Sequence, residues 1–202
     1  MEYRPIADAD LSKIRGVFFD IDDTFTTGGK ITSEAFAALW RLHDSGKIVV
    51  PVTGRPAGWC DHIARMWPVT AVIGENGAFY FTMKGGKLEK IYMADKEERD
   101  QARANLEKIK KEVLEKYPNA GIASDQDYRE FDLAIDYCED VKRLPMEDVK
   151  EIYRIFLRHG ATAKISSIHI NGWFGRHDKL LGCKFFVQRE LGLSLDDHND
   201  EY

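Results

Sequence analysis

The stretch Val17-Phe18-Phe19-Asp20-Ile21-Asp22-Asp23-Thr24 decides the fold of this 202-residue chain. Its apolar half predicts a strand that is buried on both faces, and in open α/β sheets the ligand crevice lies beyond the carboxyl ends of such strands. Asp20 stands at that exit. Buried carboxylates are costly unless a metal, a cation or hydrogen-bond donors compensate them, so the Asp run indicates a cation site. A solvated Asp-rich turn is the alternative interpretation.

Composition and charge narrow the class of protein. With 44% hydrophobic residues, the chain can bury a sizeable core and hold one domain plus a smaller inserted one. Its 29 Lys and Arg against 34 Asp and Glu give a net charge of -5, which argues against a nucleic-acid partner. No apolar stretch approaches the ~20 residues of a spanning helix.

The N-terminal residues and the cysteines indicate the cellular compartment. The N-terminal Met1-Glu2-Tyr3-Arg4 lacks the apolar core of a signal peptide. Cys60, Cys138 and Cys183 are odd in number and widely spaced, unlike a disulfide framework. We therefore expect a cytoplasmic protein with no membrane partner.

Strand and helix signals alternate in the first part of the chain, up to about Gly77. The pattern predicts a helix at 33–45, a strand at 48–52, a helix at 56–66 and a third strand from 71. This alternation is typical of a parallel, doubly wound sheet.

The pattern then changes. Residues 79–92 predict a hairpin, 96–116 a long charged helix, 131–137 a half-buried strand, 146–158 a second helix, and 161–170 one or two more strands. Two helices on one face of an antiparallel sheet make a compact α+β unit.

Three motifs resemble one family, the haloacid dehalogenase superfamily. Its first motif, Asp-x-Asp-x-Thr, matches Asp20-Ile21-Asp22-Asp23-Thr24. Its second motif, an apolar strand ending in Thr or Ser, resembles Ile48-Val49-Val50-Pro51-Val52-Thr53-Gly54-Arg55. The strand and turn Ala71-Val72-Ile73-Gly74-Glu75-Asn76-Gly77-Ala78 are similar to those of the Cof-like branch, subfamily IIB.

The resemblance implies the fold class and the domains. We expect an α/β protein: a haloacid dehalogenase-like, Rossmann-like parallel sheet core with an inserted α+β cap domain. The core would comprise residues 1–81 and 173–202, and the cap 82–172. Such caps cover the active site, and short hinges would let this one open and close.

The resemblance also implies a magnesium-dependent phosphatase acting on a small phosphorylated metabolite. Asp20 would attack phosphorus and form an aspartyl-phosphate. Asp22 would protonate the leaving group and then take a proton from water. The Asp20 carboxylate and the Asp22 carbonyl would bind Mg²⁺, which suits oxygen ligands and phosphate.

Further residues follow from the same resemblance. Thr53 would donate its hydroxyl to a phosphate oxygen, with Gly54 and Asn76 beside it. Lys179 would offset the charge of phosphate and Asp20, and Lys184 is the fallback for this third motif. Phosphoryl transfer needs mainly positioning and charge neutralisation, which these groups would supply.

Other residues keep two interpretations. Asp23 and Thr24 would shape the nucleophile loop. Arg55 is either a helix-start side chain or an anion contact. The polar and aromatic run at 166–176 either faces the substrate or turns a corner.

The chain departs from the family at its C-terminal end, where the fourth core strand and the acidic fourth motif are expected. The run 194–202 imitates that motif through Asp196 and Asp200. The only apolar residues between Gly192 and these acids are Leu193 and Leu195, too few for a buried strand of ~5 residues. We therefore interpret the run as a polar loop, which leaves the parallel core incomplete with an exposed edge. Truncation, a domain fragment, a completing partner chain and a homodimer are all compatible with such an edge.

Two other functions stay open. A phosphomutase or phosphotransferase would use the same aspartyl-phosphate but pass the phosphoryl group to a sugar hydroxyl instead of water. A non-catalytic phosphate-binding or assembly module would bind without turnover, as the missing acidic motif would favour.

Overall fold

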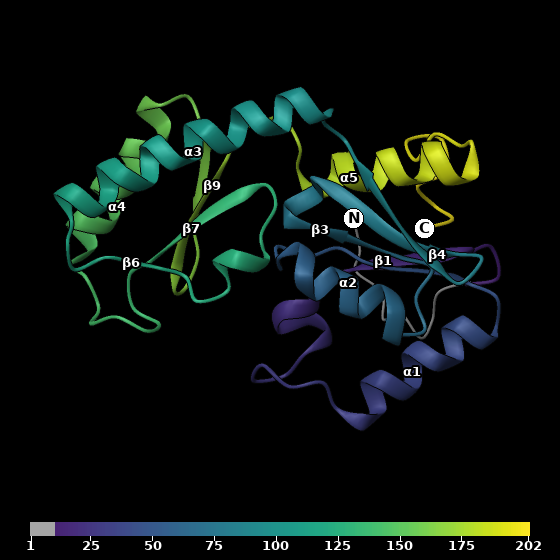
Figure 1. The fold of residues 1–202 in the computed structure, drawn as a ribbon. Helices are drawn as coiled ribbons and strands as arrows, with labels where there is room; N and C mark the ends of the chain where they lie inside the picture. Colours follow the sequence, from purple (N-terminus) through teal and green to yellow (C-terminus); the bar gives the residue numbers. More distant parts are fainter. Residues whose placement is uncertain (1–10) are drawn as a thin grey trace, which may run out of the picture.

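The computed structural model describes residues 11–202, so the segment interpreted above as lacking a signal peptide, Met1 to Arg4, lies outside the described residues. Figure 1 shows two units side by side, each built on its own sheet. We call residues 96–173 the second unit and the remainder of the described chain the core unit. None of the helices within 11–202 is long and apolar enough to cross a membrane.

The core unit begins with parallel strands. Strand β1 (Gly16–Phe19) pairs in parallel with β2 (Ile48–Pro51). A parallel bridge between Val52 and Ile73 then joins β2 to β3 (Ala71–Gly74). These strands have the order and direction that the alternating pattern predicts, and the α/β fold class is confirmed.

An antiparallel hairpin extends the same sheet. Strand β4 (Phe79–Lys84) pairs with β3 through the register Ala71↔Thr82, and β5 (Lys87–Tyr92) pairs with β4. The predicted start of the cap at residue 82 therefore falls inside a strand of the core unit.

Helices cover both faces of the core sheet (Figure 1). They are α1 (Ser33–Asp44), α2 (Ala57–Met66) and α5 (Lys179–Phe186), which continues as the π-turn η5 (Val187–Leu191). Strand β4 separates the two cores: Phe79 and Phe81 pack with α2, whereas Tyr80 packs with α5. This alternation is the period of two that a strand imposes on its side chains.

The second unit is the predicted α+β arrangement. Its antiparallel sheet has the order β6 (Gly121–Ile122), β7 (Asp132–Asp136), β9 (His169–Trp173), β8 (Thr162–Ile165). Helices α3 (Lys96–Lys116) and α4 (Met146–Arg158) bury a common core against it that includes Ile109, Ile135 and Phe156. The capping box of Asp95 and Glu98 fixes the start of α3.

Strand β1 is half-buried rather than buried on both faces, because it is an edge strand in the described sheet. At that edge the Glu201 carbonyl accepts hydrogen bonds from the N–H groups of Arg15, at 2.7 Å, and Gly16, at 3.3 Å. The Tyr202 ring packs on Phe18, with ring centroids 6.1 Å apart.

Candidate active site

The loop that follows β1 and carries Asp20, the predicted nucleophile, is called the nucleophile loop; it leaves the sheet through a short π-turn, η2 (Ile21–Phe25). Ile21 is buried in the core, while Asp20 and Asp22 both line a cavity. The Asp20 carboxylate accepts a hydrogen bond of 2.8 Å from the Ile21 N–H. Thr26 closes the turn: its hydroxyl accepts from the Asp23 N–H at 3.2 Å and donates to the Ile21 carbonyl at 3.1 Å. Asp23 takes up the left-handed conformation, with φ of 57°, which Asp tolerates better than most residues.

Lys179, the first residue of α5, reaches the nucleophile loop. Its Nζ lies 2.5 Å from Asp20 Oδ2. Two glycines permit this approach, because a Cβ on Gly77 would lie 2.0 Å from the Asp178 carbonyl oxygen, and one on Gly182 would lie 2.8 Å from the Gly77 Cα. The tight contact between the Asn-Gly turn and the start of α5 thus fixes Lys179 beside Asp20.

The predicted phosphate-binding residues divide into two groups. Gly54 and Asn76 line the cavity and lie against each other, since a Cβ on Gly54 would be 3.2 Å from Asn76 Oδ1. Thr53 is fully buried and is not part of the cavity wall. Its hydroxyl oxygen accepts a hydrogen bond of 3.0 Å from the Arg55 N–H. Its predicted contact with phosphate stays a prediction.

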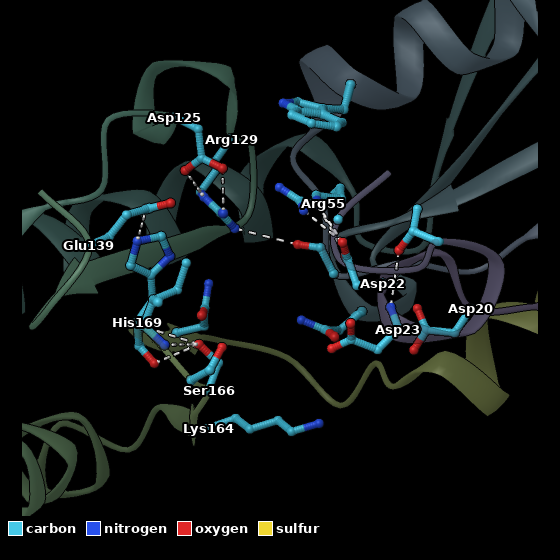
Figure 2. A pocket seen from close by; sticks show the side chains of 18 of the residues that line it. Asp20, Asp22, Asp23, Arg55, Asp125, Arg129, Glu139, Lys164, Ser166 and His169 are labelled. Atoms are coloured by element: carbon cyan, nitrogen blue, oxygen red, sulfur yellow. Dashed lines mark hydrogen bonds and ion pairs between the residues drawn. The ribbon is translucent and has the colours of Figure 1, made fainter. Parts of the chain in front are cut away.

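The cavity measures about 570 Å³ and lies between the two units. Figure 2 shows Asp20, Asp22 and Asp23 from the core unit facing a wall of polar side chains from the second unit. Its lining residues are Asp20, Asp22, Asp23, Thr26, Gly29, Gly54, Arg55, Trp59, Asn76, Ser124, Asp125, Arg129, Glu139, Lys164, Ser166, Ser167, Ile168, His169, Asn171 and Lys179.

An arginine network in the second unit escaped the sequence analysis. Arg129 lies 2.9 Å from Asp125 Oδ2 and 3.0 Å from Asp132 Oδ1, and its side chain is 5% exposed. Its Nη1 also reaches the Gly54 carbonyl in the core unit, at 3.5 Å. Asp125 lies four residues before Arg129 and Asp132 three residues after it. In a sequence, charges this close together are typical of a solvated turn. The fixed partners raise the pKa of Arg129 although burial lowers it.

The polar and aromatic run at 166–176 has two parts, of which one faces the cavity and the other does not. Its first part lines the cavity, with Ser166, Ser167, Ile168, His169 and Asn171. Residues 173–176 do not reach that cavity. His169 Nε2 lies 2.8 Å from Glu139 Oε2, an ion-pair distance without the angle of a hydrogen bond. Lys164 extends from the same wall.

The C-terminal candidates lie elsewhere. Lys184 Nζ is 2.7 Å from Asp196 Oδ1, and neither residue lines the cavity. Asp200 does not line it either. The structure therefore brings Lys179, and not the fallback Lys184, to the nucleophile loop.

The acidic loop fits a hard cation in its donor chemistry. Mg²⁺ commonly binds through one or two carboxylates together with substrate phosphate and retained waters, rather than in an all-protein cage. Asp20 and Asp22 supply oxygen donors of this kind at the cavity wall. Within residues 11–202 no three or more Asp, Glu, His or Cys side chains form a metal-binding group. The residues therefore suit a cation that shares its coordination with a bound phosphate.

The sequence matches the family model of the haloacid dehalogenase-like hydrolases over residues 17–132. This match covers more than half of the chain, and the protein belongs to the haloacid dehalogenase-like hydrolase family. No curated protein matches the sequence itself.

Solved structures share the fold at low sequence identity. Thermoplasma acidophilum 0175 is 18% identical with a TM-score of 0.68, over 91% of this chain and 74% of that one. A sugar phosphatase of subclass IIB is 17% identical with a TM-score of 0.61, over 90% and 78%. The C-terminal domain of C. albicans trehalose-6-phosphate phosphatase is 18% identical with a TM-score of 0.66, over 94% and 67%. The fold is thus shared with subclass IIB, the branch that the motifs resemble.

Proposed function

We propose that this protein is a magnesium-dependent phosphatase that hydrolyses a small phosphomonoester through an aspartyl-phosphate on Asp20. The observation that carries the proposal is the 2.5 Å contact between Lys179 Nζ and Asp20 Oδ2. This contact supports the proposal because it brings a cation to the Asp20 carboxylate at the wall of a polar cavity. Such a cation offsets the charge that a carboxylate and a phosphate dianion bring together.

The reaction has two steps. In the first, a carboxylate oxygen of Asp20 bonds to phosphorus, the bond from phosphorus to the leaving oxygen breaks, and Asp22 gives its proton to that oxygen. In the second, water bonds to phosphorus while Asp22 takes the water proton. The bond between phosphorus and Asp20 then breaks, and inorganic phosphate leaves.

The remaining groups position the phosphoryl group. Mg²⁺ held by the Asp20 carboxylate and the Asp22 carbonyl would supply charge neutralisation. Gly54 and Asn76 would lie beside the phosphate oxygens, and the Thr53 hydroxyl would donate to one of them. The polar wall of the second unit would contact the leaving group of the substrate.

The test is hydrolysis of para-nitrophenyl phosphate with Mg²⁺ and with the metal chelated. Turnover should require Mg²⁺ and should disappear in Asp20→Asn. Asp23→Asn is the matched control, because Asn also tolerates the left-handed conformation that Asp23 takes in the loop, and the Asp23 carboxylate has no part in the two chemical steps. Turnover that persists in Asp20→Asn would refute the proposal.

The molecule that accepts the phosphoryl group distinguishes a phosphatase from a phosphotransferase or phosphomutase. Transfer of the phosphoryl group to an added sugar or alcohol in preference to water would indicate a phosphotransferase or phosphomutase. Binding of Mg²⁺ and inorganic phosphate without turnover would indicate a binding module.

The cytoplasmic location is part of the proposal and is supported by three free thiols. A homodimer is proposed on the edge position of β1.

A further inference from the structure

Arg55 and Asp22 form a two-point ion pair inside the cavity, and their side chains face each other in Figure 2. Arg55 Nη2 lies 2.6 Å from Asp22 Oδ1, while Arg55 Nε lies 3.0 Å from Oδ2 and 3.2 Å from Oδ1. A planar guanidinium that contacts both oxygens fixes the plane of a carboxylate, which a single ammonium contact does not.

Arg55 is itself held from several sides. Its N–H donates to the Thr53 hydroxyl oxygen at 3.0 Å, and its carbonyl accepts from the Glu75 N–H at 3.2 Å. Its guanidinium carbon lies 4.4 Å from the centre of the Trp59 ring, a cation–π distance. Among the described residues the Asp22 carboxylate makes hydrogen bonds and ion pairs only with Arg55. The orientation of Asp22 therefore depends on Arg55.

Two cationic side chains of the core unit line the cavity, and they contact different carboxylates. Lys179 contacts Asp20, and Arg55 contacts Asp22. Both oxygens of Asp22 act as hydrogen-bond acceptors in this arrangement. A carboxylate has about four acceptor sites, so three contacts leave room for one more donor. An acceptor role is what the second step requires, where Asp22 receives the proton of the attacking water.

We propose that Arg55 is a positioning residue for the second step, which holds the Asp22 carboxylate as the proton acceptor for the water that cleaves the aspartyl-phosphate. This inference rests on the proposed phosphatase function. In the step, the oxygen of water bonds to phosphorus and its proton passes to Asp22. The bond between phosphorus and Asp20 breaks, and its electron pair returns to the Asp20 carboxylate.

The test separates the two steps kinetically in Arg55→Met. Because kcat/KM reports the steps up to release of the leaving group, it should stay near the wild-type value. The value of kcat should fall about tenfold or more, up to the roughly 10²- to 10⁴-fold that general acid–base catalysis contributes, and KM should fall in parallel. Rapid mixing with para-nitrophenyl phosphate should show a burst of nitrophenol equal to the enzyme concentration, since the phosphoenzyme accumulates.

The controls stay close to the site. Arg65→Met removes an arginine of α2, whose Nε lies 2.6 Å from Asp61 Oδ1 outside this cavity, and should leave the kinetics unchanged. Arg55→Lys keeps the charge but loses the planar fork, so its kcat and burst should fall between wild type and Arg55→Met. The Arg55 side chain is 35% exposed, so these variants should fold, as thermal unfolding would verify.

Several outcomes would overturn the inference. A raised KM without a burst would make Arg55 a substrate-binding residue. An equal loss in kcat and kcat/KM would assign it to the first step, and a higher kcat would make the ion pair a resting-state lock. If wild type is inactive, or Asp20→Asn is active, the phosphatase proposal fails and this inference fails with it. Active wild type, inactive Asp20→Asn and no burst in Arg55→Met would refute the Arg55 role alone.

Discussion

The side chain of Glu75, the residue that follows β3, accepts a hydrogen bond of 2.8 Å from the N–H of Glu130, which leads into β7. Its carboxyl group also accepts from the N–H groups of Phe131 and Asp132 in the second unit, and from Ala57 at the start of α2. One buried side chain of the core unit thus anchors the start of strand β7 in the second unit. It follows Gly74 and precedes Asn76, so the anchor is adjacent to the cavity wall.

This anchor makes stability depend on pH. Burial, together with the charge of Asp132, raises the pKa of Glu75 to about 8, although the N–H donors lower it. The unfolded chain releases this proton near the ordinary pKa of Glu, about 4.3. Between these values the folded state binds more protons than the unfolded state. The free energy of unfolding should therefore fall as pH rises through this window.

Glu75→Gln, which carries no proton to titrate, should flatten that slope in urea unfolding across the same pH range. Glu130→Gln is the matched control, since its carboxylate is partly exposed, pairs with Lys90 and makes no contact with Glu75, and it should retain the wild-type slope. A wild-type free energy of unfolding that is constant across the window would contradict the raised pKa.

Because the Asn-Gly turn packs tightly against α5, one methyl group added at Gly77 should strongly destabilise the protein. Gly77→Ala would place a Cβ 2.0 Å from the Asp178 carbonyl, at a φ of +104°. We expect a loss of roughly 3 kcal/mol in the free energy of unfolding, as for other overpacked sites, and reduced turnover because Lys179 shifts. Denaturant unfolding and para-nitrophenyl phosphate hydrolysis would measure both.

Gly86 provides the comparison for Gly77. It also has a positive φ, +76°, but a Cβ there would meet nothing within 4 Å. Gly86→Ala should cost only about 1 kcal/mol, the strain of a left-handed residue, and leave turnover unchanged. Equal losses in the two variants would show that the turn and α5 are not in the tight contact described.

The helix ranges that the sequence predicts correctly depend on local patterns of residues. The apolar stripe and the ends of α3 and α4 lie within short windows, so their predicted ranges, 96–116 and 146–158, agree with the structure. The hairpin at 79–92 was predicted as a hairpin but not as part of the core sheet. Its three consecutive aromatic residues, Phe79 to Phe81, carried the signal that was missed, because a strand apolar on both sides is buried on both faces.

The second unit's share of the cavity could not be predicted in the same way. Arg129, Glu139 and Lys164 reach the cavity only because two sheets meet at one side of the nucleophile loop. That juxtaposition depends on contacts such as the one between Glu75 and Asp132, far apart in sequence. Motif resemblance located Asp20, Asp22 and Lys179, since these follow a family pattern rather than a local propensity.

The buried arginine network predicts a strong effect on stability. Arg129→Met would leave the carboxylate of Asp132, which is 1% exposed, with Asn171 as its remaining side-chain partner. Removing one member of a buried ion pair typically costs about 3–5 kcal/mol. Arg154→Met, which breaks an exposed pair with Glu151, should cost at most about 1 kcal/mol. Denaturant unfolding of both variants would compare them, and similar losses would argue against a buried charge at Asp132.

Two lysines of one helix allow the assignment of the third motif to be tested. Lys179 contacts Asp20, whereas Lys184, five residues later, contacts Asp196 away from the cavity. Lys179→Met should lower kcat for para-nitrophenyl phosphate by roughly a hundredfold or more, the scale for loss of a group that stabilises transition-state charge. Lys184→Met should remain close to wild type, because its surface ion pair contributes little. Comparable losses in both would mean that α5 acts as a whole, and a larger loss in Lys184→Met would reverse the assignment.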